Sequence, residues 1–440
     1  MKQLIVTVHK ARGHRAGARL HSGFGLVELM ISITIGLVII AALVALFMGT
    51  SRNNREMATA SSVIENGRFA IQLLESDVVH AGFWGTFVPQ FDDQTIDEAP
   101  DPVTVLPTGV PDDSGIPPDP CVPYDPAAWD ATYEKNLIGI PTQTYTAADF
   151  VTDTTCDDVL PDLGDIVANT DVLVVRHADT CVAGDPDCEA DTDGKLYFQS
   201  ALCADEVPAF VLGVTGTDAF PFTRRSCAPA DLADKRKFVS NIYYVRSYSV
   251  DEAEDPQIPT LVRSEFELDA GGDLVHLESV PLIEGIEAMR VELGIDSLSE
   301  NGGAVDYGAD IDWVNADTKT EVNNRGDGVP DGEFVRCDPC DTDQLINVTA
   351  VKIYVLARSR EETVGYVDPK TYALGPDLAL GPYNDGFKRH VYSTTVRLPN
   401  VSGRRTRPGD EPPPPGGGAL PPGGEPEPEP VPEPVPLPGP

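Results

Sequence analysis

Basic residues are scarce in this chain of 440 residues, which has 32 Lys and Arg but 70 Asp and Glu. The formal net charge is -38. A surface this acidic repels phosphate backbones, which excludes nucleic acid as a partner of the head surface. Histidine is scarce too, with seven in total. The four that follow residue 23 are scattered and form no ligand pair: His80, His177, His276 and His390.

Catalytic patterns are also missing from the sequence. It contains no glycine-rich phosphate loop with a lysine, and nothing marks a nucleophile. Arg176-His177 ends an apolar run as in histidine phosphatases, but Ala178 stands where a glycine would admit the phosphate. We therefore expect no enzymatic activity and no certain cofactor.

Cysteine offers a single CxxC pattern, Cys337 to Cys340, without the second pair that zinc would need. All eight cysteines follow a long apolar segment, and an even number in an exported chain predicts disulfides. Sequence alone does not select among the pairings. Proximity favours four of them: Cys121–Cys156, Cys181–Cys188, Cys203–Cys227 and Cys337–Cys340.

The N-terminal segment has the properties of a membrane anchor. Residues 1–23 hold five basic residues and no acid, and Phe24–Met48 is apolar or small over 25 residues except for Glu28. A helix of that length reaches nearly 40 Å at about 1.5 Å per residue, which crosses a bilayer. The basic flank should stay cytoplasmic, with the C-terminal bulk outside. A secretory signal peptide fits poorly, because the apolar run is too long and no small-x-small cleavage site follows it.

A plain anchor does not explain Glu28, since a carboxylate within the membrane costs about 2.5–3.5 kcal/mol. The run Gly23-Phe24-Gly25-Leu26-Val27-Glu28 resembles the prepilin signature of type IV pilins, with Gly25 where many pilins have Thr. The resemblance implies that a prepilin peptidase cuts between Gly23 and Phe24 and that Phe24 becomes N-methylated. It also implies that Glu28 pairs with the Phe24 amine of a neighbouring subunit.

The helical pattern continues beyond the membrane. Apolar or small residues recur at spacings of three and four along one helix face: Ala60, Ile64, Gly67, Ile71, Leu74 and Val78. We predict one helix over residues 24–82, transmembrane over 24–48, whose second half packs on a globular head.

Four stretches resemble the PilW-like branch of minor pilins: Glu65–Ala70, Ala81–Gly85, Arg290–Asp296 and Val391–Leu398. The resemblance implies a minor pilin that primes or caps a type IV pilus and takes part in adhesion. Its partners would be the prepilin peptidase, other major and minor pilins and the bacterial inner membrane. The chain would pass the membrane once, with its head in the periplasm and later in the pilus at the cell surface. A type II secretion pseudopilin and a membrane-tethered calcium-dependent adhesin remain alternatives.

The remainder reads as an α+β protein, in which the long helix packs on an antiparallel head. Residues 83–165 are rich in Pro, Asp and Thr and predict a loop-rich insertion, and residues 166–403 predict the β-rich head. Residues 404–440 are dominated by Pro, Gly and Glu, which predicts a disordered tail. Seven segments have strand patterns: 171–175, 242–245, 260–268, 274–280, 286–295, 348–356 and 391–398.

Residues 323–333 resemble the start of a calcium loop. Oxygen ligands would come from the side chains of Asn323, Asp327 and Asp331 and from the carbonyl of Val329. Calcium takes six to eight oxygens, which such spacing gathers on one side of a turn.

Two departures weaken this motif. Arg325 stands where an acid or amide is expected, and Phe334 stands where a bidentate Glu is expected. Four acids are candidates to complete the ligands: Glu333, Asp306, Asp310 and Asp312. An acidic turn without an ion is the alternative.

Overall fold

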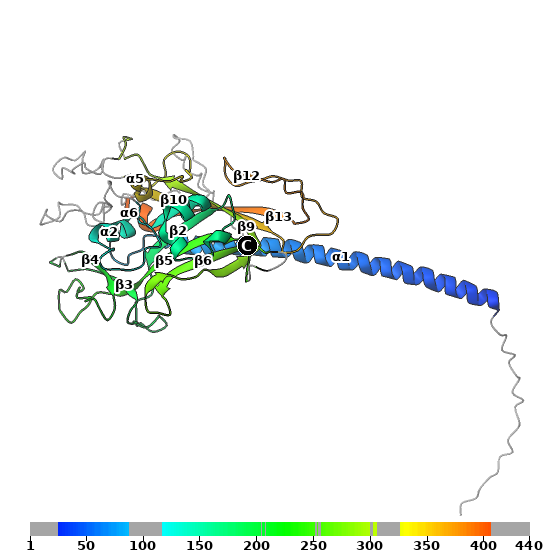
Figure 1. The fold of residues 1–440 in the computed structure, drawn as a ribbon, viewed down its shortest axis with the longest axis horizontal. Coiled ribbons are helices and arrows are strands. Elements are labelled where there is room, and N and C mark those ends of the chain that lie inside the picture. The colour runs from blue at the N-terminus through cyan, green and yellow to red at the C-terminus, as the bar shows by residue number, and fades with distance from the viewer. Residues whose placement is uncertain are drawn as a thin grey trace, which may run out of the picture.

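A long helix projects from a head of antiparallel sheets (Figure 1). The computed structural model describes residues 25–87, 117–203, 205–206, 208–250, 253, 257–299, 302–305 and 326–405. Helix α1 (Leu26–Val78) has its first half outside the head and its second half packed against it. This arrangement confirms the predicted α+β class. The helix ends at Val78, four residues before the end predicted at residue 82.

The larger sheet has eight strands, and every pair in it is antiparallel. Its main path runs β1-β2-β5-β3-β4, and β6 adds β7 and β8 beside β5. The strands are β1 (Thr142–Thr146), β2 (Asp171–Ala178), β3 (Leu196–Ser200), β4 (Phe210–Val214), β5 (Lys235–Arg246), β6 (Thr260–Leu268), β7 (Leu274–His276) and β8 (Val280–Glu284).

A second sheet carries the helix. Its order is β13-β10-β9, and α1 packs mainly on β13 and β10. The strands are β9 (Ile286–Ile295), β10 (Val348–Arg358) and β13 (Arg389–Arg397), and a short ribbon is formed by β11 (Tyr372–Ala373) and β12 (Ala379–Leu380). The largest hydrophobic cluster joins α1 to both sheets, so the helix forms part of the core of the head.

The buried face of α1 differs from the predicted one. Gly67, Leu74 and Val78 are buried as expected, but Ile64 is 49% exposed and Val63 is buried in its place. Both positions are apolar, so periodicity alone could not decide which of them faces the head.

The described residues of the predicted insertion 83–165 are not simply loops, which corrects the prediction for them. Within this insertion, residues 117–165 contain a sheet strand and several short helices: α2 (Ala131–Gly139), α3 (Ala147–Asp153), and the 3₁₀ turns η2 (Thr155–Asp158) and η3 (Leu163–Asp165). Strand β1 escaped prediction because its buried residues are Thr142, Gln143 and Thr144, which show no apolar alternation. Strands β3 and β4 were missed as well, and the segment 274–280 divides into β7 and β8.

The head closes with two short helices, α5 (Thr342–Ile346) and α6 (Pro399–Arg405). Arg405 is buried and donates to the Asn347 side chain at 2.8 Å, so α6 belongs to the head and not to the tail predicted from residue 404. Residues 406–440 of that predicted tail lie outside the described residues.

Candidate functional site

The first half of α1 presents apolar side chains that no described part of the head covers. The most apolar window of this helix is 0% buried, and by length and composition α1 can cross a membrane. Leu26, Phe47 and Met48 are each at least 66% exposed. An uncovered apolar surface of this length marks contact with lipid or with other apolar helices.

Glu28 lies in the first turn of this apolar half. Its carboxylate oxygen Oε2 accepts a hydrogen bond from the backbone N–H of Gly25 at 3.1 Å. The carboxylate therefore points toward the N-terminal end of the helix, where Phe24 joins the chain. Gly23 and Phe24, the predicted cleavage pair, lie outside the described residues.

The second half of α1 is seated on the sheet through a close approach at Gly67. A Cβ atom at this position would lie 2.1 Å from the ring of Tyr392 on β13. Glycine is therefore required for the ring to pack directly against the helix backbone. The predicted helix face contained Gly67, but the sequence did not show that an aromatic ring fills the space.

A buried polar cluster holds the end of α1 to the larger sheet. The Asp77 carboxylate accepts hydrogen bonds from His177 at 3.0 Å, from Asn241 at 3.0 Å and from the Tyr243 hydroxyl at 2.9 Å. Burial alone would raise the pKa of Asp77, but these bonds, led by that from His177, hold it below its usual value. Burial would likewise lower the pKa of His177, but Asp77 raises it. A hydrogen-bonded carboxylate–imidazole pair thus joins helix to sheet.

The chain leaves the helix in a fixed direction. Gly82 adopts a positive φ of 73°, and its N–H donates to the Arg176 carbonyl on β2 at 3.0 Å. The Asn400 side-chain amide on α6 donates to the carbonyls of Val79 and Ala81 at 3.2 and 3.3 Å. Residues far apart in the sequence therefore fix this junction.

Arg176 and His177 form hydrogen bonds inside the head. They are the pair that resembles a phosphatase strand end. The buried Arg176 guanidinium donates to the Ile140 carbonyl at 3.1 Å, while His177 bonds Asp77. Burial lowers the pKa of Arg176. Both side chains thus connect the strand to neighbouring elements.

The eight cysteines form four disulfides, and these join the same pairs that proximity favoured. The Cα–Cα distances are 4.9 Å for Cys121–Cys156, 5.6 Å for Cys181–Cys188, 5.2 Å for Cys203–Cys227 and 4.7 Å for Cys337–Cys340. All four bonds lie outside the strands of the sheets. Such bonds are typical of exported domains.

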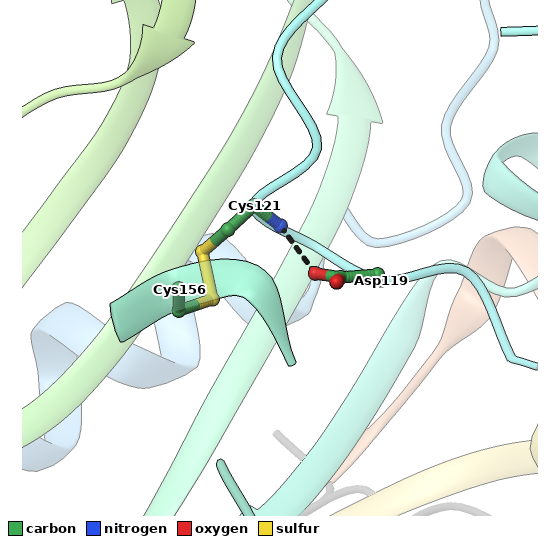
Figure 2. Close-up of side chains that lie close together, drawn as sticks. All are labelled: Asp119, Cys121 and Cys156. Atoms are coloured by element: carbon green, nitrogen blue, oxygen red, sulfur yellow. Dashed lines mark hydrogen bonds between the residues drawn. A yellow bond between two sulfur atoms is a disulfide. The ribbon is translucent and has the colours of Figure 1, made fainter. Parts of the chain in front are cut away.

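The first of these disulfides has an acidic neighbour, Asp119 (Figure 2). The Asp119 carboxylate accepts from the Cys121 N–H at 2.9 Å and from the Thr155 N–H at 2.7 Å. Because the sulfur atoms of Cys121 and Cys156 are bonded to each other, they offer no thiolate ligands, and Asp119 instead links two loops through its hydrogen bonds.

The predicted calcium loop is described from residue 326 onward, so Asn323 lies outside the described residues. Asp327 accepts from the Val329 N–H at 2.8 Å, and Asp331 accepts from the Leu298 N–H at 2.7 Å. Within the described residues, neither carboxylate belongs to a group of three acidic, His or Cys side chains at metal-ligand distances.

Protein groups hold the turn of this loop. Asp296, fully buried, accepts from the Gly328 N–H at 2.8 Å and pairs with Arg405 at 3.3 Å. Burial raises the pKa of Asp296 to about 6 despite Arg405. Calcium binding here stays a prediction; Asp296 bonds the turn through the Gly328 N–H, and Arg405 in turn bonds Asp296.

Two family models match the chain. Residues 18–44 match the prokaryotic N-terminal methylation motif, and residues 242–400 match the type IV pilus-assembly protein W family. The second match runs from within β5 to α6 and includes the entire sheet on which α1 packs.

Among solved structures, a type IV-like pilin from Thermus thermophilus is similar to the chain. The identity is 14%, the match covers 53% of this chain and 80% of the other, and the TM-score is 0.20. No curated protein matches the sequence.

Proposed function

Because the chain is a type IV pilin-like protein of the PilW family, we propose that it is a minor pilin. Its apolar helix and methylation motif indicate membrane anchoring and processing by a prepilin peptidase. In this proposal the head lies in the periplasm before assembly, and α1 later joins the helices of other pilins in the filament. The role is structural.

The observation that supports this proposal best is the contrast within α1. The apolar half is uncovered and holds its one carboxylate, Glu28, toward its free end, whereas the other half is built into the core. The cost of Glu28 in an apolar environment requires a partner, and the Phe24 amine of a neighbouring subunit would be one of opposite charge.

Within pilus assembly, we place the chain at an end of the filament, where it primes or caps it. The sequence has a net charge of -38, so many copies side by side would repel one another. This self-repulsion favours a few copies over a repeated subunit. Adhesion at the exposed end is compatible with that position.

Deletion of the gene tests the proposal against the pseudopilin alternative. We expect loss of surface pili, measured by electron microscopy and shear preparation, with normal release of type II secretion substrates. A secretion defect with normal pili would assign the chain to the secretion system instead. Complementation with the intact gene controls for effects on neighbouring genes.

A further inference from the structure

A turn of the head reaches back along α1 to the point where the apolar half ends. The turn is Thr363–Tyr366, closed by a hydrogen bond from the Tyr366 N–H to the Thr363 carbonyl at 3.0 Å. Gly365 has a positive φ of 80°, as the third residue of a type II turn requires. Val364 is thereby placed at the tip, where it is 86% exposed.

The turn is attached to the helix. Arg52 Nη2 donates to the Val364 carbonyl at 3.1 Å, so the tip lies level with Arg52. A groove of about 370 Å³ separates the two segments. It is lined on the helix side by Phe47, Met48, Ser51, Arg52, Arg55, Glu56 and Thr59 and on the other side by residues 361–364.

A buried network gives the turn a fixed position. The side chain of Asp368, two residues after the turn, is fully buried and accepts from the Tyr372 hydroxyl at 2.9 Å and from Arg389 at 3.2 Å. The Thr363 N–H also donates to the Gly386 carbonyl at 2.8 Å. These contacts therefore hold the exposed Val364 in a fixed position.

Helix geometry places this tip relative to a bilayer. From Leu26 to Met48, α1 is about 35 Å long at 1.5 Å per residue, which matches a hydrocarbon core of about 30 Å. Arg52 lies about 6 Å beyond Met48, within a headgroup layer that is roughly 5–8 Å deep. Val364 lies at the same level because Arg52 bonds its carbonyl.

We propose that the turn Thr363–Tyr366 rests on the headgroup layer of the membrane that α1 crosses, with Val364 inserted at the interface. This inference depends on the membrane anchoring of the proposed function. The groove carries both signs of charge, with Arg52 and Arg55 opposite Glu361 and Glu362. With Glu56 also on the helix side and paired with Arg52 at 3.1 Å, the lining offers both arginine and carboxylate groups, which suits a zwitterionic headgroup with a phosphate and an ammonium better than a partner of one charge. The turn would limit the tilt of the head on its helix before assembly.

Site-specific lipid quenching tests the proposal on the full chain. Val364→Cys, Val250→Cys and Ala45→Cys are labelled one at a time with an environment-sensitive fluorophore, because all eight native cysteines are in disulfides. Each variant is placed in phosphatidylcholine nanodiscs with and without doxyl-labelled lipid. Val250 is the matched control: it is 76% exposed and lies beside Asn66, about 21 Å farther along the helix than Arg52.

The proposal predicts roughly a twofold loss of emission at Val364, as for a probe ~5–10 Å into the interface, and none at Val250. Quenching at Ala45 with none at Val364 would overturn the inference while leaving the anchor intact. Failure of quenching at Ala45 would overturn the anchor and this inference with it. Disulfide-linked dimers of Val364→Cys without lipid quenching would instead assign the turn to contact with a second copy.

Discussion

The two halves of α1 differ in what covers their apolar side chains. The first half is almost uniformly apolar and exposed, so its environment must come from lipid or from neighbouring helices. The second half alternates apolar and polar faces, and the sheet of its own chain covers the apolar one. One helix therefore has a half whose packing is completed within the chain and a half whose packing is completed outside it. Substitutions in the first half should therefore impair assembly and leave the head stable, whereas substitutions in the second half should destabilise the head.

The largest loss of stability is expected from substitution of Arg389. Its fully buried side chain pairs with Glu287 at 2.5 Å, with Asp385 at 2.6 Å and with Asp368 at 3.2 Å. Arg389→Met removes the cation that these three acids share, so the free energy of unfolding should fall by about 3–5 kcal/mol in the detergent-solubilised full chain.

The control for Arg389 is Arg360→Met. The Arg360 side chain is 55% exposed and pairs with Glu284 at 2.8 Å, so its loss should cost about 0–1 kcal/mol. Chemical denaturation with intact disulfides measures both. Equal effects of the two substitutions would refute the importance of the buried network.

Two glycines of α1 test the comparison directly. Gly67→Val places side-chain atoms into the ring of Tyr392 and should destabilise the head by about 1–3 kcal/mol. Gly36→Val in the apolar half meets nothing within 4 Å and should leave the stability of the head unchanged. Tyr392→Ala combined with Gly67→Val should recover part of the loss. A destabilising Gly36→Val would contradict the separation of the two halves.

A smaller, pH-dependent effect is expected at His177. Its pKa is raised, so its contribution is complete below the ordinary value of 6.5 and is lost as pH rises through the folded value. The pKa of Asp77 is lowered, so its contribution holds above 3.8 and is lost as pH falls through the folded value. Between these limits His177→Gln should cost about 1 kcal/mol.

Denaturation of the native chain and of His177→Gln across the pH range tests this contact. The difference in unfolding free energy between the two chains should shrink as pH rises through the folded-state pKa of His177. His390→Gln is the control, because His390 is exposed on β13 and its ring packs edge-on against that of Tyr392, with 4.7 Å between the ring centroids. A constant difference at all pH values would show that the His177 contact does not depend on charge.

The smallest effect concerns the predicted calcium loop. If calcium binds, its addition should raise the melting temperature by a few degrees, as mass action on the folded state requires, and Asp327→Ala should remove the gain. Calorimetric titration that detects no binding to the native chain would remove calcium from the account.

Features that repeat locally were predictable from the sequence. The apolar run with Glu28 identified the exposed half, and alternation located strands such as β6 and β9 at the residues observed. Strand β1 was missed because Thr and Gln side chains fill its buried positions, so the alternation on which strand prediction depends was absent.

The contacts that hold α1 on the head could not be predicted from local sequence patterns. Asp77 meets its partners His177, Asn241 and Tyr243 across 100 to 166 residues of sequence. The available signal was one acid beside the apolar face of an amphipathic helix, which identifies no partner. Gly67 gave a comparable hint of close approach, but only the fold shows that Tyr392 makes it.

Filament incorporation of Glu28→Ala tests the central claim most directly. The variant should insert, be processed and keep a stable head, because the hydrogen bond of the Glu28 side chain among the described residues is the local one from the Gly25 N–H. Its amount in sheared filaments should nevertheless fall roughly tenfold, which corresponds to about 1.4 kcal/mol lost per subunit contact. Glu56→Ala, which removes the exposed pair with Arg52 on the same helix, should incorporate normally. Normal incorporation of Glu28→Ala would contradict the account.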